Sequence, residues 1–249
     1  MGIVVDYVVA SQKVNSVLAC PTGTGNGTQT AFGLLRPSGI LVPNVRALNA
    51  LRRNDWQGNQ LLYPTPRTNW FGGVIGASGW TTEANCTNTP SSVVGPDGVT
   101  TDGATIVVTS AGSSGTYGYC TLTSSGGDNV HSLWMKGAVG GESVQVKDPS
   151  FTNIIATFIL TTGWKRYSYI DSGQTTGAGL WIVPPPSSTI YAARGQVELG
   201  NVLTSWINNP TYNTSGVTLT DYSLTGTTVN LAQAPAAGAT LNWDGSWVS

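Results

Sequence analysis

The side chains that could do acid-base chemistry in this sequence are few and scattered. The single histidine, His131, stands beside Ser132, and a Ser-His-acid triad would need this imidazole as its base. No G-x-S-x-G motif accompanies the pair. We therefore expect a structural or surface role for His131 rather than catalysis.

The acidic residues give no sign of a glycosidase. Glycoside hydrolysis needs two carboxylates at a set separation around the scissile bond. The twelve acids of this chain are dispersed, and nothing singles out a pair. Glu198 lies in an apolar strand-like segment, where a carboxylate is expected to bond to its neighbours. The sequence thus favours a non-enzymatic protein without a cofactor.

Metal-binding patterns are equally sparse. Three cysteines (Cys20, Cys86 and Cys120) and one histidine do not supply a zinc site of normal spacing, so the cysteines are expected in the core. Their number and separation also argue against a disulfide framework. Four aspartates in loop-like stretches leave two interpretations open, a structural calcium site or turn caps: Asp97, Asp102, Asp128 and Asp148.

Aromatic residues are the more promising binding groups, with nine Trp and nine Tyr in the chain. Sugars stack their apolar faces on aromatic rings, and Trp is large enough to pack in a core while one edge stays wet. Trp134 and Trp164 lie in strand-like segments and are expected in the core. The candidate glycan-binding residues are Trp70, Trp181, Tyr117 and Tyr119.

The composition excludes several classes of partner. Only 9% of residues are charged and the net charge is −1, without a basic stripe, which disfavours nucleic-acid binding and a polybasic membrane patch. No apolar run approaches the ~20 residues needed to span a bilayer. The N-terminal stretch carries Asp6 and no leading basic residue, so it makes a poor signal peptide.

Glycine, proline, Thr and Ser interrupt the chain about every ten residues, a rhythm typical of β-sandwiches and barrels. The expected strands are 106–109, 130–136, 143–147, 154–160, 164–170, 180–183 and 190–199. In 143–147, Val144 and Val146 face one side. The segment 154–160 is nearly all apolar, so we expect a central, buried strand there.

One short helix is expected over 45–56. Val45, Leu48 and Leu51 recur at helical spacing there and would form a small apolar face. Elsewhere helical signals are almost absent, so the fold class is all-β.

Five short motifs occur in order between Arg67 and Ile207. They are R-T-N with a later Trp (Arg67, Thr68, Asn69, Trp80), P-D-G-x-x-T (Pro96, Asp97, Gly98, Thr101), S-x-x-x-K (Ser132, Lys136), G-W-x-R (Gly163, Trp164, Arg166), and Q-x-E-x-G followed by T-S-x-I (Gln196, Glu198, Gly200, Thr204, Ser205, Ile207). Together they resemble a β-sandwich module of tailed-bacteriophage tail and virion-surface proteins, which is similar to carbohydrate-binding modules. That module usually has a Trp before its glutamine, where this chain has Ala193-Arg194-Gly195, so its aromatic platform is altered.

The two chain ends resemble halves of a second phage element. Gly23–Phe32 matches the first half and Thr220–Gly238 the second. The resemblance implies a jelly-roll β-sandwich inserted into, or flanked by, a small β domain formed by both ends. The expected domains are 1–60 (an arm, the first part of the small domain and the short helix), 61–211 (the sandwich) and 212–249 (the second part).

This resemblance implies a structural protein of a phage particle, made in the bacterial cytoplasm. The tail, fibre or baseplate is the expected position, with host glycan adhesion as a further role. The alternatives are a capsid decoration or head-fibre protein, and the binding module of a glycan-active enzyme. Other virion proteins and a homo-oligomer, a trimer above all, are the expected partners. The apolar stretch Ile3–Val9 is a candidate segment for docking with a neighbour.

Overall fold

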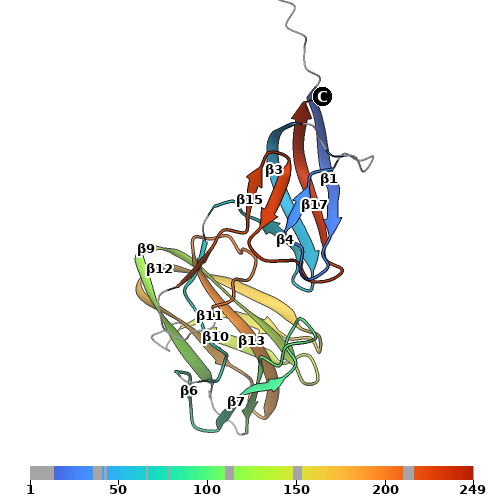
Figure 1. Ribbon diagram of the computed structural model, residues 1–249. Helices are drawn as coiled ribbons and strands as arrows, with labels where there is room; N and C mark the ends of the chain where they lie inside the picture. Colours follow the sequence, from blue (N-terminus) through green and yellow to red (C-terminus); the bar gives the residue numbers. More distant parts are fainter. Residues whose placement is uncertain are drawn as a thin grey trace, which may run out of the picture. The chain divides into compact units, whose positions relative to one another are not determined.

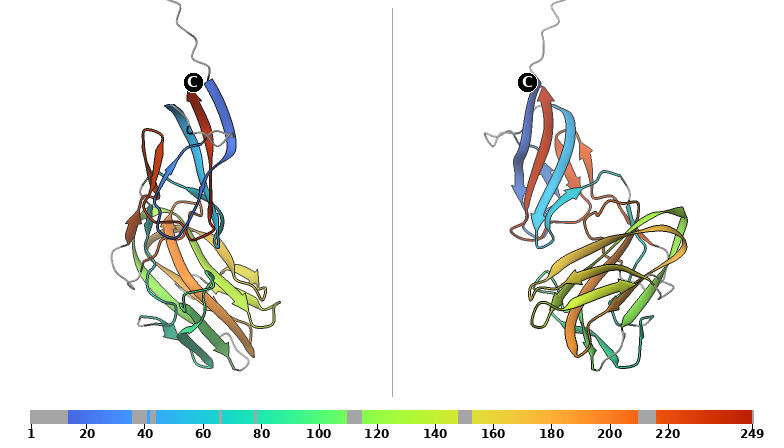
Figure 2. Two further views of the ribbon diagram at one scale, coloured as in Figure 1. Left: turned by 45° about the vertical axis from the view of Figure 1, so that its right-hand side comes forward. Right: turned by 180° about the vertical axis from the view of Figure 1, so that it is seen from behind.

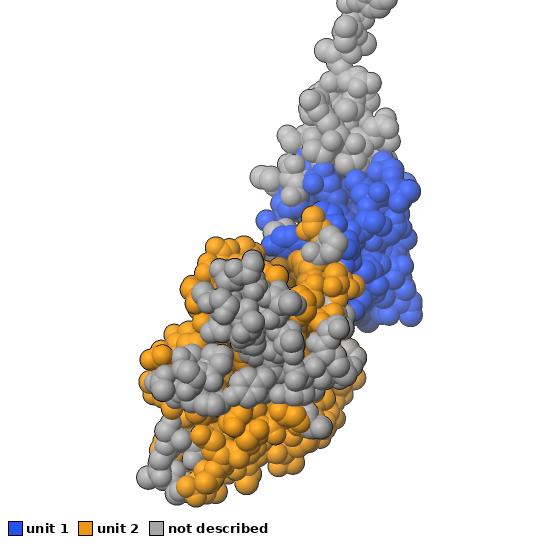
Figure 3. All heavy atoms as spheres, turned by 90° about the vertical axis from the view of Figure 1, so that its left-hand side faces the viewer, with its two compact units in different colours: residues 1–64, 220–249 blue, residues 65–219 orange. Residues whose placement is uncertain are grey.

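The computed structural model describes residues 14–35, 41, 44–65, 67–77, 79–109, 115–147, 153–209 and 216–248. The chain forms two compact units, which Figure 3 colours separately. The end unit comprises Met1–Pro64 and Thr220–Ser249, and the sandwich unit comprises Thr65–Leu219. The sequence placed these borders at 60/61 and 211/212. Each unit is described by itself below.

Both ends of the chain build the end unit. Its larger sheet is antiparallel and has the order β1 (Val14–Thr24), β17 (Thr240–Val248), β3 (Asn44–Asp55) and β4 (Gly58–Leu62). A second sheet joins β15 (Tyr222–Thr225), β16 (Thr228–Leu231) and β2 (Ala31–Gly33). Strands β1 and β17 lie side by side in Figures 1 and 2. The sandwich is therefore inserted between the two halves of this small β unit, which is one of the two arrangements that the sequence left open.

The prediction of a helix over 45–56 is wrong, because this segment forms strand β3. Both edges of β3 are paired: Leu51 lies opposite Trp243 of β17 on one side and Leu62 of β4 on the other. Leu51 and Trp243 are fully buried in the core of the end unit. Pairing with two distant strands outweighs a weak local helical period, because both neighbours bury the same apolar side chain.

The sandwich unit contains one eight-stranded sheet that folds into two layers. The strands are β6 (Thr81–Thr82), β7 (Cys86–Val93), β8 (Gly103–Val108), β9 (Thr116–Gly137), β10 (Ser143–Lys147), β11 (Ile154–Ile159), β12 (Lys165–Val183) and β13 (Ser188–Leu199). Their order is β11-β10-β12-β9-β13-β8-β7, with β6 beside β9. The long strands β9 and β12 pair along their length and belong to both layers.

Layer A consists of β7, β8, β13, the second half of β9 and the first half of β12. Layer B consists of β6, β10, β11, the first half of β9 and the second half of β12. Leu133 and Met135 of layer A share one core cluster with Val144 and Val146 of layer B. Because side chains alternate along a strand, the residues between them point away from the core. The all-β sandwich expected from the sequence is confirmed.

Strand β11 differs from its prediction. The apolar run 154–160 was expected to be central and buried, but β11 is the edge of the sheet and pairs with β10. Ala156 and Phe158 pack against the core, while Ile154 and Ile159 are 52% and 61% exposed. An edge strand presents one face to the core, so a continuous apolar run does not establish a central position.

Among the described residues no helix has the length and apolarity to cross a membrane. The two-stranded pair β5 (Arg67–Asn69) and β14 (Val217–Leu219) completes the sandwich unit. Strand β5 brings Arg67 and Asn69 to the outer face of layer A, where they contact β13 and the residues after it.

Candidate functional site

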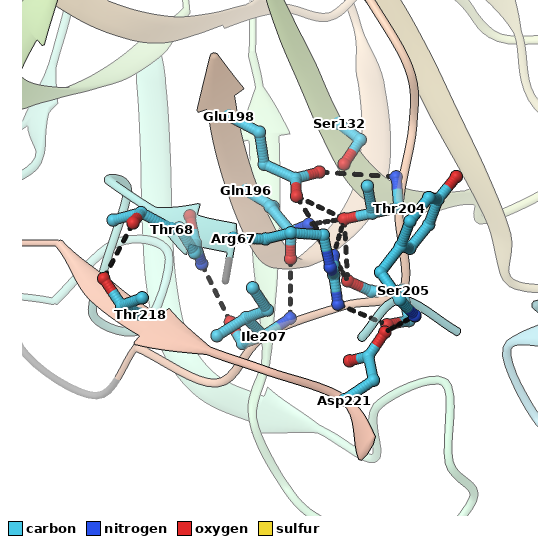
Figure 4. Close-up of polar contacts among 12 residues, drawn as sticks. Arg67, Thr68, Ser132, Gln196, Glu198, Thr204, Ser205, Ile207, Thr218 and Asp221 are labelled. Carbon is cyan, nitrogen blue, oxygen red and sulfur yellow. Dashed lines mark hydrogen bonds and ion pairs between the residues drawn. The ribbon is translucent and has the colours of Figure 1, made fainter. Parts of the chain in front are cut away.

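Residues of four of the five motifs meet on the outer face of layer A. We call residues 200–209, which follow β13, the closing segment. Polar side chains from β5, β9, β12 and β13 converge on this segment, as Figure 4 shows for part of the network. The converging residues are Arg67, Asn69, Ser132, Arg166, Gln196 and Glu198.

Arg67 and Glu198 form the centre of the network. Nη1 of Arg67 lies 3.2 Å from Oε1 of Glu198, and its Nη2 donates to the Ser205 hydroxyl over 2.9 Å. The Thr204 hydroxyl accepts from Arg67 and donates to Glu198. Glu198 is 3% exposed, so its charge is compensated by contacts within the protein. The prediction that Glu198 bonds to its neighbours is confirmed.

Two buried amides fix the backbone of the closing segment. Gln196 accepts the Ile207 N–H over 2.6 Å and donates to the Ser205 carbonyl over 3.1 Å. Asn69 donates to the Ile207 carbonyl over 2.9 Å, and its Oδ1 accepts the Val197 N–H over 3.1 Å. The stretch 204–207 of this segment is irregular and largely buried, so it needs such partners, because unpaired backbone groups are costly away from water.

Arg166 reaches the same segment from β12. Its Nη2 and Nε donate to the Ser132 hydroxyl over 2.9 and 3.2 Å, and its Nη1 donates to the Thr204 carbonyl. The guanidinium stacks on Trp134, 4.6 Å from the ring centroid. Burial lowers the pKa of Arg166 to about 10, with nearby Glu198 opposing this change, so the group stays charged at neutral pH. Trp134 is buried, as predicted, but on the outer face rather than between the layers.

A second ion-paired group joins the P-D-G-x-x-T turn to β13. Nη2 of Arg194 lies 2.6 Å from Asp97, and its Nε lies 2.6 Å from Asp102. Arg194 has a φ of 53° and sits at an irregularity in β13 between Ala193 and Gln196. Its guanidinium also lies 4.8 Å from the ring centroid of Trp206 in the closing segment. Arg194 thus connects the P-D-G-x-x-T turn to the closing segment.

The aspartates considered for calcium have other contacts here. Asp97 and Asp102 both face the Arg194 guanidinium, a cation already in place. Burial alone would raise the pKa of Asp97, but hydrogen bonds from the Val99 amide, Arg194 and Thr100 hold it well below its ordinary value. Asp128 is exposed, and Asp148 lies outside the described residues. The described residues contain no cluster of three His, Cys, Asp or Glu side chains.

His131 is fully buried on the core side of β9. Its Nδ1 lies 3.0 Å from the Tyr169 hydroxyl, and burial lowers its pKa to about 4 against a weaker opposing effect of the Gly179 backbone. Ser132 points to the opposite face of the strand, toward Arg166. The two side chains therefore do not form a nucleophile-base pair. The structural role expected for His131 agrees with this position.

The predicted glycan-binding residues do not form one platform. Tyr117 and Trp181 lie edge-on with ring centroids 5.5 Å apart, and Nζ of Lys147 lies 5.0 Å from the Trp181 ring. Trp181 is 6% exposed, which differs from the surface position that we predicted, because its neighbours pack against the ring. The side chain of Tyr119 lies outside the described residues.

Trp70 lies at another place, beside the Arg67 network. It lines a pocket of about 210 Å³ together with Arg67, Thr68, Glu198, Leu199 and Thr204. Its backbone N–H donates to the Val197 carbonyl over 2.9 Å, which anchors the start of the unit to β13. The indole is half-buried and packs against the core cluster.

The sequence missed a second aromatic group on the outer face of layer A. Trp164, expected in the core, is half-buried, and its indole N–H donates to the Val94 carbonyl over 3.1 Å. Nζ of Lys136 lies 4.9 Å from the Trp164 ring and 5.0 Å from the ring of Tyr191. Alternation along β9 and β13 could have placed Lys136 and Tyr191 on one face, but their strand register could not be known.

Comparisons with known proteins give distant structural likenesses. No family model matches the chain, and no curated protein sequence matches it. A family 4 carbohydrate-binding module is similar at 14% identity and a TM-score of 0.33, covering 39% of this chain and 70% of that one. The xylan-binding CBM22 domain from Paenibacillus barcinonensis is similar at 12% identity and a TM-score of 0.37, covering 57% and 96%.

A third similar structure is the enzymatically active domain of a tailspike protein of bacteriophage CBA120. The identity is 16% and the TM-score 0.37, with 52% of this chain matched to 21% of that chain. This chain therefore spans about a fifth of that tailspike structure. Likenesses at these identities and TM-scores carry no information on ligand or partner.

Proposed function

We propose that this chain is a non-catalytic structural component of a bacteriophage particle, located on the tail, fibre or baseplate, that contributes to adhesion to host glycans. The observation that carries the proposal is the convergence of four of the five ordered motifs on the closing segment, to which Arg194 links the fifth through Asp97. These motifs resemble a phage virion module, and in this chain they hold a sandwich together rather than assemble a catalytic group.

The use of the ionisable residues supports a non-catalytic role. Glu198 is bonded to Arg67 and Thr204, and His131 faces the core next to Tyr169. Asp97 and Asp102 are paired with Arg194. A glycosidase needs one carboxyl group that gives up a proton and another that stays ionised beside the sugar. The described carboxylates named here are engaged in ion pairs inside the protein, which favours binding over hydrolysis.

The inserted architecture also fits a particle component. The end unit contains segments from both sides of the sandwich in the sequence, so two chain connections, near residues 64 and 220, join the two units. We propose that the end unit joins neighbouring copies or other virion proteins in a cyclic oligomer, a trimer above all, because closed cyclic symmetry is the common solution for repeated subunits. Ile3–Val9, the proposed docking stretch, lies outside the described residues.

Immunogold electron microscopy of intact particles tests the proposal. Antibody against this protein should place gold on the tail or its fibres. Gold spread over the head would replace the tail position with the capsid-decoration alternative. Particles without gold, although denatured particles react with the same antibody on a blot, would contradict surface adhesion. Release of reducing sugar from host glycan by the purified protein would instead support a glycan-active enzyme.

A further inference from the structure

The outer face of layer A carries a cation between two aromatic rings. We call Lys136, Trp164 and Tyr191 the lysine-aromatic cluster. Nζ of Lys136 lies 4.9 Å from the centroid of the Trp164 ring and 5.0 Å from that of the Tyr191 ring. All three side chains are half-buried, so each keeps part of its surface in solvent.

The position of the cluster follows from the sheet. Tyr191 of β13 lies directly opposite Lys136 of β9 and, on its other side, opposite Thr105 of β8. Side chains of directly opposite residues lie on the same face, so the three form one row across three strands. Trp164 precedes β12 and is fixed by its hydrogen bond to the Val94 carbonyl. The row is thus held by regular backbone pairing.

Lys136 has no anionic partner among the described residues. No carboxylate within the described part of the chain lies in ion-pair range of its ammonium, whose contacts are the two rings. Asp97 and Asp102, which precede β8, are paired with Arg194. Aromatic faces hold the ammonium in place without neutralising it. A half-buried, oriented and unneutralised cation is suited to an anionic ligand.

The neighbouring groups specify the kind of anion. Tyr191 and Trp164 provide ring surfaces on which the C–H face of a pyranose packs. Thr105 and Ser92, whose hydroxyls lie 2.7 Å apart, add hydrogen-bonding groups at the end of the row. A phosphate ion would use the ammonium but none of the ring surface. A sugar that bears a carboxylate uses both.

We infer that the lysine-aromatic cluster binds acidic glycans, with the ligand carboxylate paired to Lys136 and its pyranose ring packed on Tyr191 and Trp164. This inference rests on the proposed role in glycan adhesion and names the ligand class and the residues that recognise it. Trp181 is a poorer centre for the same role, because its side chain is buried, with 6% of its surface exposed.

Calorimetric titration of the full chain with a panel of uronate-containing oligosaccharides, and with the same sugars after carboxyl reduction, tests this inference. The acidic sugars should bind more tightly than their reduced counterparts. Lys136→Gln should weaken binding of the acidic sugars at least about tenfold, the loss expected for a charge-assisted hydrogen bond. The effect on the reduced sugars should be small, since these lack the carboxylate.

Three further variants separate recognition from folding. Lys136→Arg keeps the cation and should retain most of the affinity. Tyr191→Ala should weaken both sugar forms, because it removes ring surface. Lys165→Gln is the matched control: this lysine is exposed, and its Nζ lies 5.3 Å from the single ring of Tyr167. It should bind like the unmodified protein. The urea midpoints of the three lysine variants should agree, while that of Tyr191→Ala should be lower because the change removes a half-buried ring.

Equal binding of acidic and reduced sugars, unaffected by Lys136→Gln, would overturn the assignment of acidic-glycan binding to the lysine-aromatic cluster. Glycan adhesion itself would then stand, with its binding site on another surface. Loss of affinity in Lys165→Gln equal to that in Lys136→Gln would overturn this assignment as well. Failure of the whole panel to bind would overturn both the cluster and glycan adhesion, while the immunogold result would still decide the structural role in the particle.

Discussion

The Nη2 atom of Arg194 lies 2.6 Å from Oδ2 of Asp97, which stands 97 positions earlier in the chain. This ion pair joins the turn before β8 to the irregularity in β13, where Arg194 adopts a φ of 53°. Residues other than glycine rarely adopt this backbone conformation, which costs about 1 kcal/mol or more. The two carboxylates and the ring of Trp206 around the guanidinium offset that cost.

Arg194→Gln should therefore lower the free energy of unfolding by about 3 kcal/mol, because it leaves the mostly buried Asp97 and Asp102 without their cation. Urea denaturation followed by tryptophan fluorescence measures the change. Lys165→Gln is the control, since this exposed lysine has no ion pair with a described carboxylate, and it should change stability by less than about 0.5 kcal/mol. Equal midpoints for the two variants would contradict a structural role for the pair.

Gln196→Ala should loosen the closing segment. The change removes the acceptor of the Ile207 N–H and the donor to the Ser205 carbonyl, at a cost of about 2 kcal/mol for the unpaired backbone groups. Limited proteolysis should then cut the chain near the exposed Leu203 more rapidly. Gln145→Ala on the outer face of β10 is the matched control, and its digestion pattern should be unchanged. Identical patterns for both variants would show that the amide does not hold this segment.

Gly195→Ala should destabilise the sandwich by about 2 kcal/mol through overpacking. A Cβ at this position would lie 2.6 Å from Cδ1 of Phe71 and 2.7 Å from Cδ1 of Leu180, both fully buried. Gly163→Ala is the paired control: its Cβ would meet no heavy atom within 4 Å, and it should be neutral or stabilise by about 0.5 kcal/mol. Thermal unfolding of both variants is the measurement, and a tolerated Gly195→Ala would refute the close packing.

The free energy of unfolding should decrease as the pH is lowered through the range in which His131 becomes protonated. Its pKa is about 4 in the folded protein and 6.5 when exposed, so the unfolded chain binds the proton first as the pH falls. The contribution of neutral His131 to the free energy of unfolding is about 3 kcal/mol. It is fully present above pH 6.5 and declines from there toward pH 4. His131→Phe should flatten the curve between these values in urea titrations at several pH values. A slope unchanged in the variant would mean that other groups cause it.

Asp97 should affect the free energy of unfolding in a separate, more acidic pH range. Its folded pKa lies well below the ordinary 3.8, so its contribution to stability is present above about pH 3.8 and is lost as the pH falls further. Asp97→Asn should remove this second decline and leave the one attributed to His131 in place. If the variant changed the curve above pH 5 instead, the ion pair with Arg194 would not be its origin.

Local sequence patterns predicted the sandwich but not the partners of its side chains. Alternation identified the segment 143–147, which is β10 with Val144 and Val146 buried. The same local reasoning failed for 45–56, where pairing with β17 and β4 decided the structure, and for 154–160, whose apolar run lies at an edge. These outcomes depend on strands far away in the chain.

The candidate site shows the same limit. Motif order placed Arg67, Glu198 and Thr204 in one module, yet their contacts join positions 131 and 137 residues apart. Spacing alone does not reveal whether such residues meet on a ligand or on one another. The lysine-aromatic cluster was missed for a related reason, since only the β9–β13 register brings Lys136 beside Tyr191.

The pairing of β1 with β17 bears on how the protein forms during translation. The partner of β1 is synthesised only after the whole of Thr65–Leu219. Sandwich strands find their partners within their own unit, so this unit can complete its core while β1 still has an open edge. An open edge strand is prone to pair with the wrong neighbour. Synthesis rate and chaperone protection of the nascent chain should therefore govern the yield of the end unit more than that of the sandwich.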